Sequence, residues 1–550
     1  MRRIHLDHGS PKLNTFMTNR LDRFLNRTYF PETPDLLFEE KKLNIARILI
    51  GFVILWRTAK VAFAANFYFP ADLSLLGINF STETVFALFE CGLAFLLTAG
   101  AFTPLVLASL ILTYPFFDKA LGISTLGTSV MLFFLFGMLM INFRSRYSFD
   151  AWAESRKENS SLRRILQRVY QIIGTPDCKR IRRIYFLCFV CYATISFGAL
   201  LHHINDPHWV NGITVSTLLT NSYWCPSYAF FQSIQASWPN AFFLLSASGI
   251  IAQTLFQFAM IPFIFSRWGT IFIVLQGLTF FMISAVFISL SYLPFVELIL
   301  WGVIFWSSSF HSMITRKQQK HSPDKTPLFA PEPKKHALYI HETYLRLSAF
   351  ALLLLIANFP TIENYTSHLK LTKHWIRDRL SHVGLVIPNV FNKTDLAMGN
   401  RWSTIYRNTD GARTFVPFHT ADGARLWYLK SDMLFYGNSL SWRRRCIEMS
   451  PDDMLDTESS VIGLLRRAVD FDSKLFPPDE NTTYEVFIYE NSANDDSLPL
   501  PERLNKKTIG KITFARDPID ANWKCVAADT SSSQPRSTQT HSPVNLTKRR

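Results

Sequence analysis

Residues 200–219 read LLHHINDPHWVNGITVSTLL, and this stretch decides how the rest of the chain is interpreted. It follows an apolar segment and contains no Lys or Arg. Its polar and aromatic residues include His202, His203, Asp206, His208 and Trp209. His and Trp suit the headgroup region of a bilayer without any further role, so the cluster is either an interfacial rim or a functional site. Both interpretations require a membrane protein.

The composition points to the same class of protein. Of the 550 residues, 48% are hydrophobic, with 49 Phe and 13 Trp, and the mean hydropathy is positive at +0.11. The formal net charge is +15, but the Lys and Arg residues mostly flank apolar runs, as in membrane proteins, rather than forming one basic domain. We therefore expect the lipid bilayer as a partner and no nucleic acid.

Nine apolar runs approach the roughly 20 residues that a helix needs to cross a bilayer core. They are 44–66, 82–101, 104–117, 126–142, 183–203, 240–265, 268–289, 292–308 and 343–359. The third run is short and has Pro104 and Pro115 near its ends, which leaves open a kinked, half-length or re-entrant piece. The sequence predicts an all-α polytopic membrane bundle of about nine transmembrane helices.

The charges between these runs predict the orientation. Strongly basic segments precede the first run, follow the fourth and follow the eighth, whereas 67–81 and 204–239 contain no Lys or Arg. Because basic loops stay in the cytoplasm, we expect the N-terminus there and everything after Pro360 outside the cytoplasm. Residues 1–42 contain no apolar segment of the kind found in a cleaved signal peptide, so the first membrane helix is expected to act as the targeting signal.

The exterior part is expected to contain a β-meander. Strand-like runs at 403–407, 414–418 and 425–429 are separated by Asp410-Gly411 and Asp422-Gly423. These dipeptides supply the positive φ angles that tight hairpins require. Three short strands are the simplest prediction from this pattern.

A helix and two further strands are predicted after the meander. Ser450-Pro451-Asp452-Asp453 has the cap, first-turn Pro and acidic first turn of a helix that runs toward Val469. Residues 483–489 and 508–515 are strand-like, and from Thr530 the composition predicts disorder. The predicted division is 1–43, a cytoplasmic basic segment; 44–310, the main transmembrane domain; 311–342, a cytoplasmic basic loop; 343–360, the last transmembrane helix; 361–527, an extracytoplasmic α+β domain; and 528–550, a disordered tail.

Ionisable groups inside apolar runs are costly and usually face a partner or a cavity. Arg57 and Glu90 are expected at similar depth, roughly 12 to 14 Å from the outer end of their helices at 1.5 Å per residue. This spacing predicts an ion pair, with a cavity-lining role as the alternative. Glu297 follows Pro294 near the outer face and is expected either to approach the histidine stretch or to be solvated at the interface.

A metal site is not expected at the histidines. Adjacent residues such as His202 and His203 diverge by about 100° on a helix, and no His-Glu-x-x-His spacing is present. Gln253 and Gln257 lie one turn apart on the sixth run, which predicts hydrogen bonding between helices.

Four short motifs between residues 44 and 310 occur in an order that resembles a known family. They are Arg47-Ile48, Arg146-Tyr147-Ser148-Phe149-Asp150, the Trp-x-x-Gly of Trp209 to Gly212 followed by Val215, and Leu290-Ser291-Tyr292-Leu293-Pro294. Together they resemble the HTTM (horizontally transferred transmembrane) domain family, which is related to the vitamin K-dependent gamma-carboxylase. Weaker similarity extends to residues 422–425.

The resemblance implies a cofactor and a site. In the carboxylase a lysine about five residues before the Trp is thought to deprotonate vitamin K hydroquinone, so that compound or another quinone is the implied cofactor. The corresponding position here is Ile204, or His203 after a one-residue insertion, and a family histidine corresponds to Phe281. The chain therefore lacks a lysine at the first position and a histidine at the second. Gamma-carboxylation, a carbon-carbon lyase type of reaction, is for this reason not expected.

Two main hypotheses follow. The first is a diverged membrane enzyme or lipid- or quinone-binding protein whose cavity is lined by His202, His203 and Glu297 as candidate catalytic residues. The second is a non-catalytic membrane scaffold whose extracytoplasmic domain binds a protein or lipid partner. A transporter ranks third, because no internal repeat or pair of interrupted helices supports it.

Overall fold

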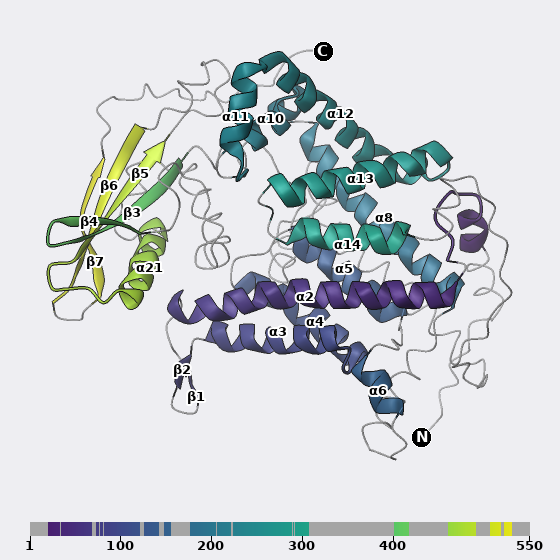
Figure 1. Cartoon of the computed structure of the whole chain (residues 1–550), viewed down its shortest axis with the longest axis horizontal. Helices are drawn as coiled ribbons and strands as arrows, with labels where there is room; N and C mark the ends of the chain where they lie inside the picture. The colour runs from purple at the N-terminus through teal and green to yellow at the C-terminus, as the bar shows by residue number, and fades with distance from the viewer. Residues whose placement is uncertain are drawn as a thin grey trace, which may run out of the picture. The chain divides into compact units, whose positions relative to one another are not determined.

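The chain contains two units, a helical unit in residues 20–306 and a β-unit in residues 401–530, which are described separately (Figure 1). The computed structural model describes residues 20–33, 35–68, 73–75, 78–80, 82–120, 126–141, 148–155, 177–204, 206–221, 224–288, 290, 292–306, 401–416, 460–490, 507–518 and 522–530.

Eight of the nine predicted apolar runs lie on helices of the helical unit. These helices are α2 (Leu36–Tyr68), α3 (Thr82–Ala99), α4 (Thr103–Ala120), α5 (Leu126–Ile141), α8 (Cys178–His203), α12 (Pro239–Phe263), α13 (Arg267–Phe287) and α14 (Leu293–Phe305). The ninth run, 343–359, falls outside the described residues. The third run lies on one continuous helix with Pro115 inside it.

Three of the described helices, rather than nine, are long and apolar enough to cross a membrane. They are the stretches Cys178–Leu201, Pro239–Phe263 and Arg267–Phe287. Four further apolar helical stretches are shorter, and they cover 84–99, 103–115, 127–141 and 293–305. The architecture is therefore mostly helical, as predicted, and length and composition support three spans.

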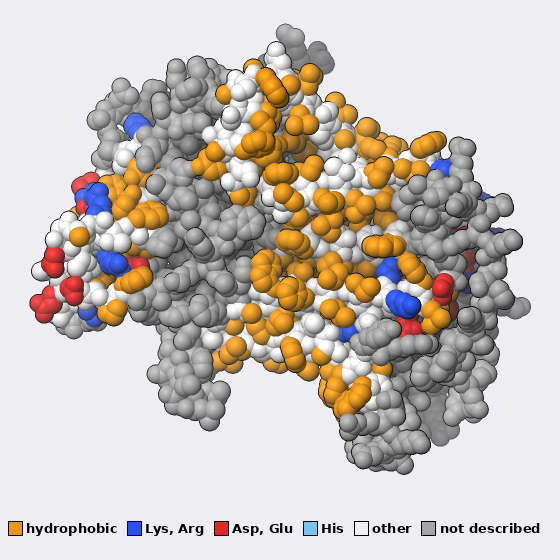
Figure 2. Space-filling view, viewed as in Figure 1, with side chains coloured by type: hydrophobic (Ala, Val, Ile, Leu, Met, Phe, Trp, Pro, Cys, Tyr) orange, Lys and Arg blue, Asp and Glu red, His pale blue; other side chains and the backbone are white. Residues whose placement is uncertain are grey.

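The outside of the helical unit is apolar. On α12 the side chains of Leu244, Ile251 and Phe258 are 66%, 62% and 61% exposed, and on α13 Leu275 is 58% exposed. Figure 2 shows apolar side chains spread over the visible face of this unit. A helix that is apolar all round and yet exposed matches a lipid environment better than water.

One end of the helical unit gathers the basic ends of several helices. Lys42 Nζ near the start of α2 donates to the Trp306 carbonyl after α14 at 3.0 Å. Arg182 at the start of α8 donates to the Leu25 carbonyl at 3.1 Å, and Arg183 pairs with Asp22 at 2.6 Å. These contacts join segments that are far apart in the sequence. The opposite end contains the connection 204–239, which has no Lys or Arg.

Several short elements of the helical unit were not predicted. They are the hairpin β1 (Leu73–Leu75) and β2 (Ile78–Phe80), and the helices α6 (Phe149–Ser155), α9 (Pro207–Val210), α10 (Thr214–Thr220) and α11 (Tyr228–Ser237). The start of α9 carries a recognisable signal, because the Asp206 side chain accepts from His208 N at 2.9 Å and Pro207 occupies the first turn. Elements this short lack the periodicity that identifies longer helices.

The β-unit is an antiparallel five-stranded sheet with the strand order β4-β3-β5-β6-β7. Its elements are β3 (Arg401–Thr409), β4 (Ala412–Val416), helix α21 (Ser460–Leu475), β5 (Thr483–Glu490), β6 (Lys507–Arg516) and β7 (Trp523–Thr530). The hairpin at Asp410-Gly411 is confirmed, with φ angles of 50° and 83°, and these positive values are those of a type I′ turn. The predicted strand 425–429 lies outside the described residues.

Two boundaries in the β-unit differ from prediction. The helix expected from Ser450 toward Val469 is described from Ser460 and continues to Leu475, while 450–459 lie outside the described residues. Strand β7 was missed, and it places 528–530 in the sheet instead of in a disordered tail. The register shifts at Thr513/Phe514, where Val526 is the extra residue of β7. This bulge interrupts the alternation that identifies a strand.

Polar contacts fix α21 on one face of the sheet. Asp472 of α21 accepts from Tyr484 Oη at 2.8 Å and pairs with Arg407 Nη1 at 3.0 Å. Ile405 and Val486 lie two residues from Arg407 and Tyr484, and both are fully buried. Because side chains alternate along a strand, these four residues share the face that α21 covers.

Candidate functional site

The histidine stretch forms an aromatic stack at the end of α8. His203 is 2% exposed, and its ring lies 4.1 Å from the Trp209 ring, with 20° between the planes. Trp209 Nε1 donates to Thr254 Oγ1 of α12 at 3.1 Å. The side chain of His202 is outside the described residues. The stack therefore attaches the chain after α8 to the side of α12.

The Trp-x-x-Gly motif ends in a turn that packs on α12. Gly212 has a φ of +77°, and a Cβ there would lie 3.3 Å from the Ala247 Cβ. Ser246 Oγ donates to the Gly212 carbonyl at 2.6 Å and accepts from Ser216 N at 3.1 Å. Glycine is required by the left-handed backbone and the close approach together.

Glu297 lies beside Tyr192 and not beside the histidines. Tyr192 Oη on α8 donates to Glu297 Oε1 on α14 at 3.0 Å, and Glu297 is 3% exposed. Tyr192 precedes His203 by eleven residues, which places the two residues roughly 16 Å apart along the helix. The expected joint cavity is therefore wrong for His203 and Glu297, and its third member, His202, has a side chain outside the described residues. Among the described residues His203 and Glu297 belong to separate clusters, and Glu297 is not solvated.

Aromatic rings surround the Tyr192–Glu297 pair. Phe281 of α13 is fully buried and meets Tyr192 edge-on at 5.8 Å and Trp301 edge-on at 5.3 Å. Tyr192 and Trp301 lie 4.9 Å apart, and Phe256 of α12 lies 5.9 Å from Trp301. Four helices thus enclose one carboxyl group and one phenol in apolar surroundings, where polar groups interact more strongly than in water.

Sequence reasoning identified Glu297 and Phe281 but missed Tyr192 and Trp301. The available signal was modest, since both missed residues are amphipathic aromatics within apolar runs, and their polar atoms usually find a partner when buried. Nothing in the local pattern indicated that Tyr192 and Glu297 would meet.

A second buried cluster surrounds Arg57. The guanidinium of Arg57, which is 2% exposed, lies 4.1 Å from the ring centre of Tyr292 and donates to Tyr114 Oη. Tyr292 Oη lies 3.2 Å from Thr128 Oγ1. Glu90 is fully buried in the same unit. The ion pair between Arg57 and Glu90 stays a prediction, and the two tyrosines are additional partners of the cation.

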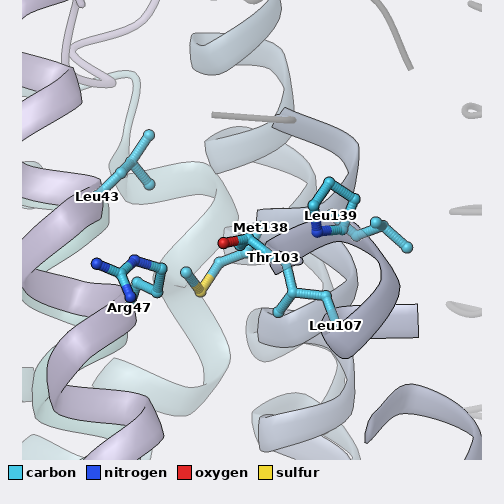
Figure 3. A pocket seen from close by; sticks show the side chains of 7 residues that line it. Leu43, Arg47, Thr103, Leu107, Met138 and Leu139 are labelled. Atoms are coloured by element: carbon cyan, nitrogen blue, oxygen red, sulfur yellow. The ribbon is translucent and has the colours of Figure 1, made fainter. Parts of the chain in front are cut away.

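The cavities of the helical unit that adjoin Met138 are small. One of about 20 Å³ is bordered by Arg47 of α2, Thr103 and Leu107 of α4, and Met138 of α5 (Figure 3). A second of about 10 Å³ lies between Met138 and Leu300. A single water molecule fits the larger one. Neither cavity is lined by His203 or Glu297.

The predicted hydrogen bonding between helices is confirmed for Gln253, whose Oε1 accepts from Gln276 Nε2 of α13 at 3.4 Å, whereas the buried Gln257 Oε1 has no hydrogen-bond partner among the described residues. The described residues include no cluster of three His, Cys, Asp or Glu side chains that could hold a metal ion.

The chain matches no protein-family model, no curated protein and no solved structure.

Proposed function

We propose that this chain is a multi-pass membrane protein of the HTTM type, with the basic end of the helical unit in the cytoplasm and the β-unit outside it. Three membrane-length helices and an apolar exterior support the placement. Trp238, Trp268 and Trp306 flank the ends of α12, α13 and α14 and are 68%, 72% and 71% exposed. Exposed tryptophans at helix ends are typical of a membrane interface. Helix α2, the four shorter apolar helices and the run 343–359 complete the proposed set of nine.

Thiol labelling tests this orientation. In a background without other reactive thiols, an impermeant reagent added to intact cells should label Asn221→Cys and Asn408→Cys but not Ser160→Cys. Labelling of Ser160→Cys together with protection of Asn408→Cys would invert the orientation. The proposed orientation requires an even number of membrane crossings between residues 221 and 408. Labelling of Asn221→Cys without labelling of Asn408→Cys would mean that this number is odd.

The proposed role of the helical unit is to bind a lipid-soluble small molecule, as a diverged membrane enzyme or a lipid- or quinone-binding protein. The hydrogen bond between Tyr192 and Glu297 carries this proposal. A carboxyl group inside a membrane unit is costly, and such residues commonly mark a functional site. Tyr192 and Glu297 offer polar atoms, while Phe281 and Trp301 offer flat apolar surfaces. This combination is typical of small-molecule sites.

The quinone that the HTTM resemblance implies fits this residue set in part. A phenol or a protonated carboxyl group can donate to a quinone oxygen, and the surrounding rings can pack against a quinone ring. The residues that would supply the carboxylase chemistry are replaced, however, by Ile204 or His203 and by Phe281. The proposed activity is therefore ligand binding or a different reaction, rather than gamma-carboxylation.

Ligand-induced stabilisation tests the proposal. The unfolding temperature of the purified protein in detergent should rise with the concentration of a short-chain naphthoquinone, because a ligand at 100 times its Kd stabilises by about 2.7 kcal/mol. Glu297→Gln and Tyr192→Phe should each weaken binding by about tenfold, the effect of losing about 1.4 kcal/mol. Thr194→Val on the same helix is the matched control, and it should bind normally. A wild-type protein whose unfolding temperature stays constant would contradict quinone binding.

The second candidate is a non-catalytic scaffold whose extracytoplasmic domain binds a partner. The water-sized cavities beside Met138 favour this candidate, since a ligand site usually has several hundred Å³ of space. It predicts no naphthoquinone effect. It also predicts that His203→Ala and Glu297→Gln change stability alone, leaving any cellular activity of the stably folded protein intact.

A further inference from the structure

We propose that the basic end of the helical unit binds the headgroups of anionic phospholipids through Arg27, Tyr29, Phe265, Arg267 and Trp268, here called the headgroup patch. This inference rests on the proposed placement of the helical unit in a bilayer. It adds a lipid class and a location that the placement alone does not specify.

Two segments that are distant in the sequence form the headgroup patch. Tyr29 N donates to the Ile264 carbonyl at 2.6 Å, and the rings of Phe24 and Phe265 meet edge-on with centroids 5.4 Å apart. These contacts hold residues 24–29 against the connection between α12 and α13. The patch therefore has a defined place at the end of two membrane-length helices.

The aromatic members of the headgroup patch are open to their surroundings. Tyr29, Phe265 and Trp268 are 46%, 48% and 72% exposed. Trp268 lies in the first turn of α13, two residues after the capping residue Ser266, whose side chain accepts from Gly269 N. Amphipathic rings at this position belong at the depth of the lipid headgroups, where one part of the ring is apolar and another is hydrated.

Basic side chains accompany these rings. Arg27 is exposed, and the guanidinium of Arg267 lies 5.8 Å from the ring centre of Trp268. The neighbouring carboxylate of Asp22 is already paired with Arg183 at 2.6 Å. Anionic headgroups complement such basic positions, whereas a zwitterionic headgroup gains less from them. The partner is a lipid and not free phosphate because the aromatic surface continues into the apolar exterior of α12 and α13.

Lipid titration of the full-length protein by native mass spectrometry tests the inference. The wild type should bind phosphatidylglycerol more tightly than phosphatidylcholine, and Arg27→Gln with Arg267→Gln should weaken phosphatidylglycerol binding by at least about fivefold. Phosphatidylcholine binding should not change. The matched control is Lys507→Gln with Arg516→Gln in the β-unit, which removes the same charge from exposed positions and should bind like the wild type.

Three outcomes would overturn the inference: equal affinity for the two lipids, an unchanged preference in the patch variant, or the same loss in the control. Displacement of the lipid by inorganic phosphate at matched ionic strength would assign the site to free phosphate instead. Carbonate extraction separates this failure from failure of the membrane placement. A chain released by carbonate contradicts the placement, whereas a chain that stays in the membrane and shows no lipid preference contradicts the headgroup patch alone.

Discussion

Arg47 and Asp150 bind the two ends of one turn, although they lie far apart in the sequence. Arg47 Nη1 donates to the Leu97 carbonyl and, at 2.6 Å, to the Thr98 carbonyl in the last turn of α3. The Asp150 carboxylate accepts from Phe102 N at 2.7 Å and from Thr103 N at 3.0 Å at the start of α4. A cation thus meets free carbonyls and an anion meets free amides, as the ends of helices require.

This arrangement gives two of the short motifs a structural role. Gly100 in the turn has a φ of +70°, and a Cβ there would lie 2.8 Å from Arg47 Nη1. The backbone and the guanidinium can therefore approach only if residue 100 is glycine. Arg47 and Asp150 each belong to one of the four short motifs between residues 44 and 310. Two of those motifs consequently serve one structural connection, and neither contributes to the Tyr192–Glu297 cluster.

Asp150→Asn should destabilise the helical unit. The substitution removes the negative charge that accepts from one buried and one part-buried amide, and hydrogen bonds to charged groups contribute about 1.5 to 3 kcal/mol each. The expected loss is about 1 to 3 kcal/mol in a denaturant titration of the detergent-solubilised protein. Asp35→Asn, an exposed carboxylate that accepts from Leu37 N, is the comparison and should cost less. Equal losses would mean that burial of Asp150 is unimportant.

Gly277→Ala should disrupt the crossing of α13 and α14. A Cβ at Gly277 would overlap the indole Nε1 of Trp301, which is 1% exposed and cannot easily move away. Overpacking of this kind costs about 1 to 3 kcal/mol. Gly302→Ala on α14 is the matched control because a Cβ there meets nothing within 4 Å. A thermal unfolding measurement in which both variants behave alike would refute the steric argument.

The Arg57–Glu90 pair can be examined with a double-mutant cycle. If the two groups meet, Glu90→Gln leaves a buried cation and should lower the free energy of unfolding by about 3 to 5 kcal/mol. The loss is smaller to the extent that the contacts of Arg57 with Tyr114 and Tyr292 stabilise the cation. Adding Arg57→Gln should recover much of that loss. Unfolding free energies that simply add would show that the two side chains do not interact.

Glu485 should make the β-unit sensitive to acid. Burial raises the pKa of this carboxyl group, but hydrogen bonds from Lys511, Asn408 and Arg413 outweigh the burial and lower the pKa to about 2. A lowered pKa stabilises the folded state above the unfolded pKa of about 4.3, and that stabilisation is lost as the pH falls toward 2.

Hydrogen exchange of β5 and β6 in the full-length protein, corrected for intrinsic rates, measures this effect. The wild type should be better protected than Glu485→Gln above about pH 5, and the difference should shrink as the pH falls toward 2. Glu480→Gln, at an exposed position before β5, is the control. A difference that does not change with pH would indicate that Glu485 acts through packing and not through its charge.

Purified protein should not carboxylate glutamate. Removing the glutamate γ-proton requires a very strong base made from the hydroquinone, and no side chain can replace it. His203 is the best available first base here, and it is stacked on Trp209. With vitamin K hydroquinone, oxygen, labelled bicarbonate and a Glu-containing peptide, incorporation should equal that of a boiled control. Incorporation that disappears in His203→Ala would make His203 the base and reverse this conclusion.

The sequence by itself determined the position of most helices and the confirmed hairpin. Long apolar runs identified α8, α12 and α13 because a helix that crosses a bilayer core needs roughly 20 predominantly apolar residues. Asp410-Gly411 identified the β3–β4 hairpin because few dipeptides accept two positive φ angles. These features are local, and so a single stretch of chain contains all the information they need.

Only the tertiary structure decided which side chains meet. Tyr192 faces Glu297, and His203 faces Trp209, because the rotation and axial offset of each helix set its contacts. An apolar run that is uniform around its circumference does not specify either quantity. Strand β7 likewise depends on β6, since its bulge at Val526 breaks the alternating pattern while the ladder to β6 continues on both sides. Helix formation depends on one segment of the chain, so the sequence of that segment was enough to predict most helices. The candidate site depends on contacts between several segments, so the sequence could name single residues but not the pairs that meet.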